Sequence, residues 1–282
     1  MADFHVNFGI RAHDIEANDI HTLFSKIHDL GIECIQLALM RSFPDLIKGT
    51  GVFNPGLANE IKKQLVKNQI RVAVLGCYIN PVASDESVRR AQLELFKEHI
   101  KFAKYIGADM IGTETGSFGT IEENRSEKVY QILLEGLREL VDYAEKLGVM
   151  IGIEPHAMYP IYDSRTAKRM LDDLNSPNVS IILDPVNILD QNNYKNQNEV
   201  MKEAFELLGD KIAVIHLKDL VFDENGNKIE KFACEGILET KTLLMLLKQH
   251  KPYIDVMLET VTAEHLDRVR SNVMKEMAAI TD

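Results

Sequence analysis

The sequence predicts an α/β protein folded as a (β/α)8 TIM barrel, on three observations. Eight short apolar segments alternate with eight amphipathic segments along 282 residues, at about thirty-five residues per pair. The apolar segments lack polar alternation, which is typical of parallel strands buried on both faces. Several of them end on an acidic side chain or an imidazole, as expected where strand ends converge on one rim. Because parallel crossovers are right-handed and eight strands close a ring, a closed barrel is favoured over an open, doubly wound sheet.

The strands are short and sharply bounded. Gly148 precedes the fifth strand, and Pro155 follows it. No linker rich in Pro, Gly or Ser divides the chain, so we expect residues 1–282 to form one domain.

Long loops are expected at residues 41–55 and 220–236. The expected strands are residues 5–10, 33–38, 70–77, 108–113, 149–153, 179–183, 212–216 and 254–258.

The helices carry start and stop signals. The first ends at Gly31, which suits the left-handed position after a helix. Asp19 or Asn18 can cap its amino terminus, and Ser84 can cap that of the third helix. The expected helices are residues 20–30, 56–68, 84–105, 126–147, 164–174, 197–208, 239–249 and 263–279.

Composition narrows the class of protein. A formal net charge of -11 argues against binding to nucleic acid, which requires clustered Lys and Arg. The amino terminus shows no basic segment before an apolar core, and no stretch is apolar enough to cross a bilayer, so we expect a cytoplasmic protein without membrane contact. Cys34, Cys77 and Cys234 are widely spaced, which predicts free thiols rather than disulfides or a structural zinc site.

Four side chains stand at the ends of the last four strands: Glu154, Asp184, His216 and Glu259. In a barrel they would meet at one mouth, where three carboxylates without a cation would repel one another. A divalent metal removes that repulsion. Oxygen ligands with one nitrogen suit Mn²⁺, Mg²⁺ or Co²⁺, and Zn²⁺ stays open. We expect Mn²⁺.

Each of these residues also has a structural interpretation. A lone Glu or Asp at a strand end is often a helix cap or the partner of a nearby Lys, and a lone His usually donates to a backbone carbonyl. Lys218 and Asp219 could be the active pair instead of His216. Gly236 could present its N–H to an anionic substrate or could form only a turn. Four such endings on consecutive strands favour the functional interpretation.

The motifs I-E-P-H, L-D-P-V-N, H-L-K-D and L-E-T surround these four residues in order. This pattern resembles the xylose isomerase-like TIM barrel family of sugar (phosphate) isomerases and epimerases, over nearly the whole chain. The resemblance implies that the four residues bind one divalent ion. It also implies that Glu154 and Glu259 exchange protons with substrate carbon from opposite faces, through a metal-stabilised enediolate.

The family also includes inosose isomerases and dehydratases, dehydroshikimate dehydratases and apurinic endonucleases, so the substrate stays open. Two positions depart from its pattern: Asn187 stands where the epimerases and endonucleases have His, and Phe222 where the epimerases have Arg. We expect a metal-dependent isomerase or epimerase of a small sugar, sugar phosphate or inosose, with a dehydratase as its nearest rival. An endonuclease would need a basic groove and further histidines, and a non-catalytic sugar binder is a fourth alternative.

Further polar side chains around the mouth are candidate substrate contacts. His156 and Lys218 each follow a metal-ligand candidate by two positions and so point to the same side of an extended chain. A structural hydrogen bond or a solvated rim lysine would be the alternative. We expect a small carbohydrate-like partner. Members of the family often associate, so a homo-oligomer stays open. The candidate contacts are His156, Lys218, Glu114, Asn187, His13 and Arg11.

Overall fold

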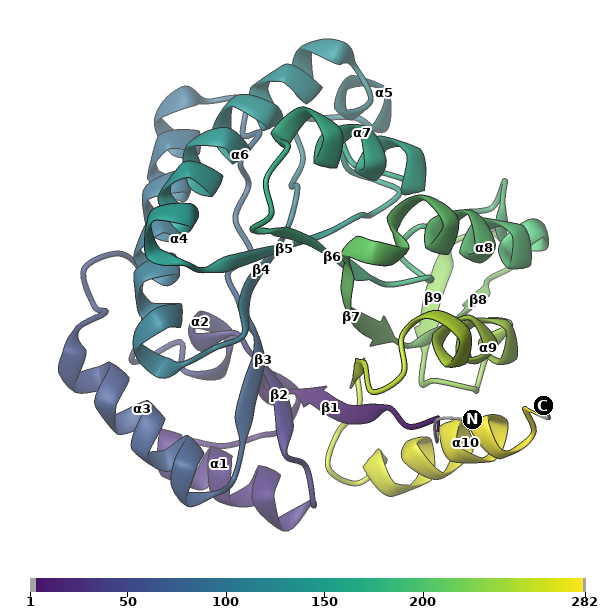
Figure 1. Cartoon of the computed structure of the whole chain (residues 1–282), viewed down its shortest axis with the longest axis horizontal. Coiled ribbons are helices and arrows are strands. Elements are labelled where there is room, and N and C mark those ends of the chain that lie inside the picture. Colours follow the sequence, from purple (N-terminus) through teal and green to yellow (C-terminus); the bar gives the residue numbers. More distant parts are fainter. Residues whose placement is uncertain (1–3, 281–282) are drawn as a thin grey trace.

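The computed structural model describes residues 4–280 and shows a closed ring of eight parallel strands with helices around it (Figure 1). The order around the ring is β1-β10-β7-β6-β5-β4-β3-β2, and β1 pairs with β10 to close it. The predicted TIM barrel is therefore confirmed. The barrel strands are β1 (Asn7–Arg11), β2 (Cys34–Leu37), β3 (Arg71–Gly76), β4 (Met110–Glu114), β5 (Met150–Glu154), β6 (Val179–Leu183), β7 (Ile212–Leu217) and β10 (Asp255–Leu258).

Every predicted helix is present, with ends within a few residues of the prediction. Two short helices, α2 and α5, and three 3₁₀ turns were not predicted, because a single turn carries no periodic signal. The helices are α1 (Ile20–Asp29), α2 (Leu39–Ser42), α3 (Pro55–Lys67), α4 (Glu86–Ile106), α5 (Ile121–Asn124), α6 (Glu127–Leu147), α7 (Ser164–Leu174), α8 (Gln197–Leu208), α9 (Thr240–His250) and α10 (Leu266–Ala278). The 3₁₀ turns are η1 (Ala12–Asp14), η2 (Tyr194–Asn196) and η3 (Gly209–Lys211).

One predicted cap is wrong. The α4 helix is capped by Asp85 and not by Ser84, because the Asp85 carboxylate accepts the backbone N–H groups of Ser87 and Val88 at 2.7 and 3.2 Å. Asp19 caps α1, as one of the two alternatives predicted. These caps satisfy N–H groups that have no partner within the helix.

The segment after β7 is an antiparallel hairpin, β8 (Asp219–Phe222) and β9 (Lys228–Lys231), where the sequence predicted a loop. Its turn is held by Asp223, whose Oδ1 accepts the N–H groups of Asn225 and Asn227 at 2.9 and 2.7 Å. The prediction failed because β9 reads Lys-Ile-Glu-Lys and is not part of the apolar core. In the view of Figure 1, the hairpin appears on the same side of the ring as α8 and α9.

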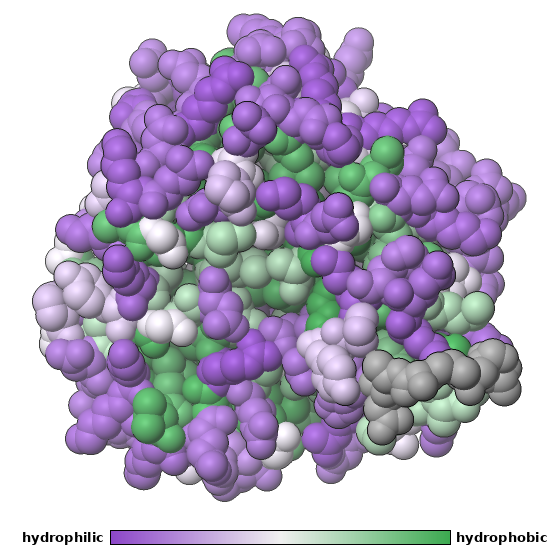
Figure 2. Space-filling view, in the orientation of Figure 1, coloured by the Kyte–Doolittle hydropathy of each residue, from purple (hydrophilic) through white to green (hydrophobic). Residues whose placement is uncertain are grey.

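The core has two parts. A large one lies between the strands and the helices, and a smaller one fills the inside of the barrel. Gly152 makes room for the inner part, since a Cβ there would lie 2.8 Å from Met110 Sδ and 2.9 Å from Ile182 Cδ1. The outer surface is largely polar, with apolar residues gathered near the centre of the view in Figure 2. The inner core comprises Cys34, Ala73, Val74, Met110, Ile182, Val214 and Met257.

The three cysteines are free thiols, as predicted. Cys34 and Cys77 are buried, and Cys234 is half-buried in the loop after β9. Burial raises the pKa of Cys234 to about 11, which keeps it in the less reactive thiol form at neutral pH. Between residues 4 and 280, none of the helices combines the length and the apolar character that a bilayer crossing needs.

Candidate functional site

The four predicted metal ligands come from four neighbouring strands of the ring. Glu154 is the last residue of β5, Asp184 directly follows β6, His216 lies near the end of β7, and Glu259 directly follows β10. The ring order β10-β7-β6-β5 places these strands side by side. All four side chains are buried, with at most 4% of each residue exposed. The fold therefore gathers them on one arc of the barrel rim.

His216 stands between two of the carboxylates. Its Nδ1 lies 3.2 Å from Glu154 Oε2 and 3.1 Å from Glu259 Oε1. Within the described residues, neither ring nitrogen makes an aligned hydrogen bond. Burial works against a charged imidazole here, but the charges of Glu154 and Glu259 outweigh it and raise the pKa of His216 to about 10.

Lys218 lies among the carboxylates. Its Nζ is 2.7 Å from Asp184 Oδ2, 2.7 Å from Glu259 Oε2 and 3.2 Å from Glu230 Oε1, and only 4% of its side chain is exposed. Burial disfavours the ammonium, yet Asp184 and Glu259 outweigh it and raise the pKa of Lys218. The protein itself therefore supplies a cation to three carboxylates. From the sequence we had expected only a metal ion to offset their repulsion.

Arg11 supplies a second cation. Its guanidinium pairs with Asp14 through Nε at 2.8 Å and Nη2 at 3.0 Å, and Nη1 lies 3.5 Å from Glu259 Oε1. Against the effect of burial, the His216, Lys218 and Arg11 charges hold the pKa of Glu259 well below its usual range. Burial lowers the pKa of nearby His13 to about 4, and neither His13 ring nitrogen has a hydrogen-bond partner among residues 4–280.

Asn187 orients Glu154. The Asn187 side-chain amide donates to Glu154 Oε1 at 2.7 Å. Asp184 in turn fixes the loop that carries Asn187, because its Oδ1 accepts the N–H groups of Val186 and Asn187 at 2.8 and 3.3 Å. Burial raises the pKa of Asp184 to about 6, and the Lys218 charge opposes this shift. The amide at position 187 is therefore committed to a carboxylate of the site.

Glu114 and His156 flank the same carboxylate. Glu114 pairs with Glu154 in the register of β4 and β5, and burial together with the Glu154 charge raises the pKa of Glu114 to about 7. The Nδ1 of His156 accepts the N–H of Met158 at 3.2 Å, and its ring lies 4.7 Å from that of Tyr159. Burial lowers the pKa of His156 to about 4, so it is neutral at pH 7.

Asp219 serves the loop and not the site. Its buried carboxylate accepts the N–H groups of Leu220 and Leu238 at 2.7 and 2.8 Å. Gly236 packs against it, since a Cβ at Gly236 would lie 2.4 Å from Asp219 Oδ1. The carboxylate partners of Lys218 are Asp184, Glu259 and Glu230, and among the described residues no ion pair joins Lys218 to Asp219.

Sequence reasoning missed four side chains near the carboxylates. The Arg41 guanidinium lies 4.3 Å from the centre of the Tyr78 ring, and the Gln36 amide donates to the Tyr78 hydroxyl. Burial and the Glu154 charge raise the pKa of Tyr78. Lys228, from β9, donates to two backbone carbonyls of the loop after β6, at 2.8 and 2.7 Å. Tyr78 and Gln36 could have been found, because each stands at or near the end of a predicted strand.

The donor set suits a divalent cation. Ligands of an octahedral ion bound at about 2.1 Å lie roughly 3 Å apart, and the two contacts of His216 Nδ1 match that spacing. As the side chains of residues 4–280 stand, however, no three His, Cys, Asp or Glu residues surround a common ion position. Lys218 engages Asp184 and Glu259 instead. The four side chains are of the kinds that bind a divalent ion. The ion could use Asp184 and Glu259 only if the Lys218 ammonium moved away from them.

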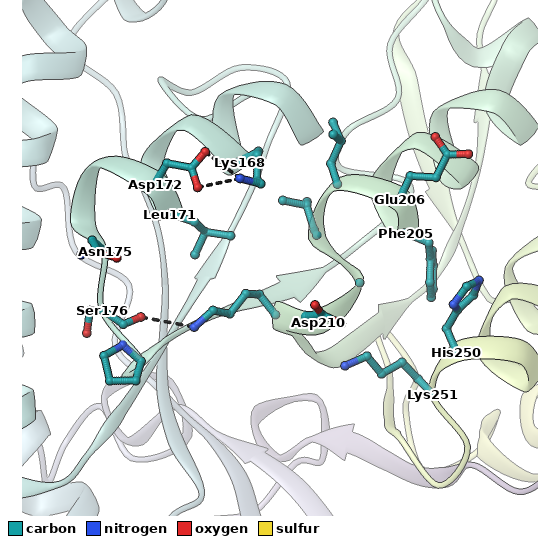
Figure 3. Close-up of a pocket in the computed structure, with 15 residues that line it drawn as sticks. Lys168, Leu171, Asp172, Asn175, Ser176, Phe205, Glu206, Asp210, His250 and Lys251 are labelled. Carbon is teal, nitrogen blue, oxygen red and sulfur yellow. Dashed lines mark hydrogen bonds and ion pairs between the residues drawn. The ribbon is translucent and has the colours of Figure 1, made fainter.

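A separate cavity of about 600 Å³ lies on the outside of the barrel, between α7, α8 and the end of α9 (Figure 3). Two of its lysines already have partners: Lys168 pairs with Asp172 at 2.6 Å, and Lys211 donates to the Ser176 carbonyl at 3.2 Å. None of the four predicted ligands lines this cavity. The chemistry-bearing residues are those at the barrel rim.

Comparisons with known proteins place this barrel in a family. The family model described as xylose isomerase-like TIM barrel matches residues 24–279, whereas the curated protein sequences give no match. Among solved structures, the IOLI protein with a bound zinc atom is 18% identical, with a TM-score of 0.77 and coverage of 98% of this chain and 100% of that one.

Two other solved structures are similar. A D-tagatose 3-epimerase-like protein is 17% identical, with a TM-score of 0.75 and coverage of 97% and 98%. The probable 3-DHS dehydratase AsbF from Bacillus anthracis is 15% identical, with a TM-score of 0.71 and coverage of 95% and 98%. At these identities the structures show a common fold, and the family model matches most of the sequence. The chain therefore belongs to the xylose isomerase-like TIM barrel family.

Proposed function

We propose that this protein is an isomerase or epimerase of a small sugar, sugar phosphate or inosose. One observation carries the proposal: Glu154 and Glu259, on strands separated by two others in the ring, both face His216 Nδ1 at 3.2 and 3.1 Å. Two carboxylates that converge from different strands can reach a bound substrate from two sides. The enzymatic relatives by fold, which include epimerases, agree with this activity.

In the proposed mechanism, the Glu259 carboxylate removes a proton from the carbon beside the substrate carbonyl, and Glu154, in its protonated form, returns a proton to the other face or to the neighbouring carbon. Asn187 holds Glu154 through its 2.7 Å hydrogen bond, so that one carboxylate oxygen stays available. Arg11, whose Nη1 lies 3.5 Å from Glu259 Oε1, favours the ionised form of Glu259, and this form can accept a proton. His156 and His13, both neutral, can donate hydrogen bonds to substrate hydroxyl groups.

A divalent ion, for which we propose Mn²⁺ first and Zn²⁺ second, would be held by Glu154, Asp184, His216 and Glu259. When bound, it supplies Lewis-acid stabilisation of the negative charge that develops on substrate oxygen. Support for an ion comes from the donor set and from the bound zinc in the similar IOLI structure. Metal analysis of the purified protein, before and after chelation, tests this part separately from turnover.

A dehydratase of the same substrate class is the second candidate, and Glu114 favours it. Burial and the charge of the neighbouring Glu154 raise the pKa of Glu114, which favours its protonated form. A protonated carboxyl beside Glu154 could donate a proton to a leaving hydroxyl. Loss of water would appear as the absorbance of an enone, which an isomerase or epimerase does not produce.

The deciding experiment follows carbon-bound hydrogen. The protein is incubated with a panel of ketoses, their phosphates and inososes in deuterated water, with Mn²⁺ or Zn²⁺, and the products are read by NMR. We expect deuterium at the carbon next to the carbonyl, together with a new isomer. A non-catalytic sugar binder would exchange no C–H, and that result would end the proposal.

Variants assign the roles once a substrate is found. Glu154→Gln and Glu259→Gln should each lower turnover by about 10²- to 10⁴-fold, the usual contribution of a general acid or base. Glu206→Gln, at an exposed position on α8, is the matched control and should retain the wild-type rate. Full turnover in either of the first two variants would refute the proton-transfer roles.

A further inference from the structure

Lys218 occupies the carboxylates that a divalent ion would use. The ammonium has three N–H donors, and three carboxylate oxygens lie within 3.2 Å of it, from Asp184, Glu259 and Glu230. Asp184 follows β6, Glu259 follows β10, and Glu230 comes from β9 of the hairpin. The contacts come from three separate segments. Lys218, Asp184 and Glu259 are almost fully buried, whereas the Glu230 side chain is 48% exposed.

At Asp184, Lys218 and a divalent ion would need the same carboxylate oxygen. The Oδ1 of Asp184 already accepts the backbone N–H groups of Val186 and Asn187, which leaves Oδ2 as its available oxygen. Lys218 Nζ is 2.7 Å from that Oδ2. An ion bound at about 2.1 Å from the same oxygen would stand too close to the ammonium for two positive charges to coexist. The same holds at Glu259 Oε2, also 2.7 Å from Lys218.

We propose that Lys218 and a divalent cation exclude one another at Asp184 and Glu259, so that an ion enters only when the ammonium moves out. This inference rests on the metal site of the proposed function and adds an antagonist from the chain itself. Lys218 thereby weakens ion binding, and its release leaves an ammonium at the mouth, close to where a substrate oxygen would lie.

The mouth offers a matched control. Lys228 also approaches the site, but its Nζ donates to the backbone carbonyls of Val186 and Leu189 at 2.8 and 2.7 Å. Within residues 4–280, it forms no hydrogen bond or ion pair with the four ligands. Removing either lysine subtracts one positive charge near Asp184. Only the loss of Lys218 also frees the carboxylate oxygens, so the two variants separate direct competition from a general electrostatic effect.

The test is Mn²⁺ binding to the full chain by calorimetry. We expect Lys218→Met and Lys218→Gln to tighten the dissociation constant at least tenfold relative to the wild type, and Lys228→Met to change it by less than threefold. Circular dichroism shows which variants are folded. Equal affinity in wild type and the Lys218 variants, equal tightening by Lys228→Met, or no Mn²⁺ binding in any folded protein would overturn the proposal.

A second readout needs no variant. In the wild type, acetic anhydride labelling is followed by peptide mass spectrometry with and without Mn²⁺. Displacement should raise labelling of Lys218 at least threefold and leave Lys228 unchanged; Mn²⁺ binding without that rise overturns the proposal. Deuterium incorporation, measured on the same preparations, reports on the proposed function independently, so either idea can fail while the other stands.

Discussion

The side-chain amide of Asn187 donates a hydrogen bond to Oε1 of Glu154 over 2.7 Å, and both residues are at most 5% exposed. Replacing Asn187 by Leu keeps a similar volume and removes the donor. We expect the rate of substrate C–H exchange to fall by about 10- to 100-fold, because residues that orient a catalytic or ligating group typically have effects of that size. Exchange kinetics by NMR measure this change.

The conservative replacement provides the control. In Asn187→His, a ring N–H can take over the donation to Glu154. We expect this variant to recover much of the rate that Asn187→Leu loses. Wild-type exchange in the Leu variant would show that the hydrogen bond does not position the carboxylate.

The sequence predicted the barrel and the convergence of four side chains, because both follow from local patterns and one topological rule. An apolar strand that ends on a polar residue is visible in the chain, and parallel strands bring such ends to one rim. Glu154, His216 and Glu259 meet as a direct consequence. The chemical roles of these three side chains at the barrel rim do not follow from the fold and stay a proposal.

The partners of Lys218 could not be predicted. Its spacing from His216 placed it on the site side of the chain, but the choice among substrate, solvent and carboxylates depends on distances between strands. The β8–β9 hairpin was missed because β9 reads Lys-Ile-Glu-Lys, which lacks the apolar pattern of a core strand. Glu230 reaches Lys218 only because that hairpin exists.

Gly236 is sterically required. A Cβ there would lie 2.2 Å from the carbonyl oxygen of Leu220 and 2.4 Å from Asp219 Oδ1. The Leu220 oxygen belongs to the backbone and cannot easily move away from the added carbon. We expect Gly236→Ala to lower the free energy of unfolding by about 2 kcal/mol or more, as overpacked sites do. Urea unfolding followed by circular dichroism measures it.

Gly209 is the matched control for this substitution. It has helical backbone angles, with φ at -47°, and a Cβ there would meet nothing within 4 Å. Gly209→Ala should therefore be neutral or stabilise the protein by up to about 1 kcal/mol. Equal stability of Gly236→Ala and the wild type would contradict the close packing of the loop against Asp219.

His99 should make stability fall in mild acid. It is fully buried on α4, its Nδ1 lies 2.9 Å from the Leu95 carbonyl, and its ring packs edge-on against Phe53 at 4.5 Å. Burial lowers its pKa to about 4, below the value of about 6.5 expected in the unfolded chain. Between these values the unfolded state binds more protons, so stability rises with pH and is lost as pH falls from 6.5 toward 4.

From pH 7 to pH 5 this histidine alone should cost about 2 kcal/mol. His99→Leu, which cannot take up a proton, should lose that much less stability over the same interval, whatever its stability at pH 7. The control His21→Gln removes an exposed histidine and should follow the wild type. Urea unfolding at both pH values gives the comparison, and parallel losses in wild type and His99→Leu would show that His99 does not drive the acid sensitivity.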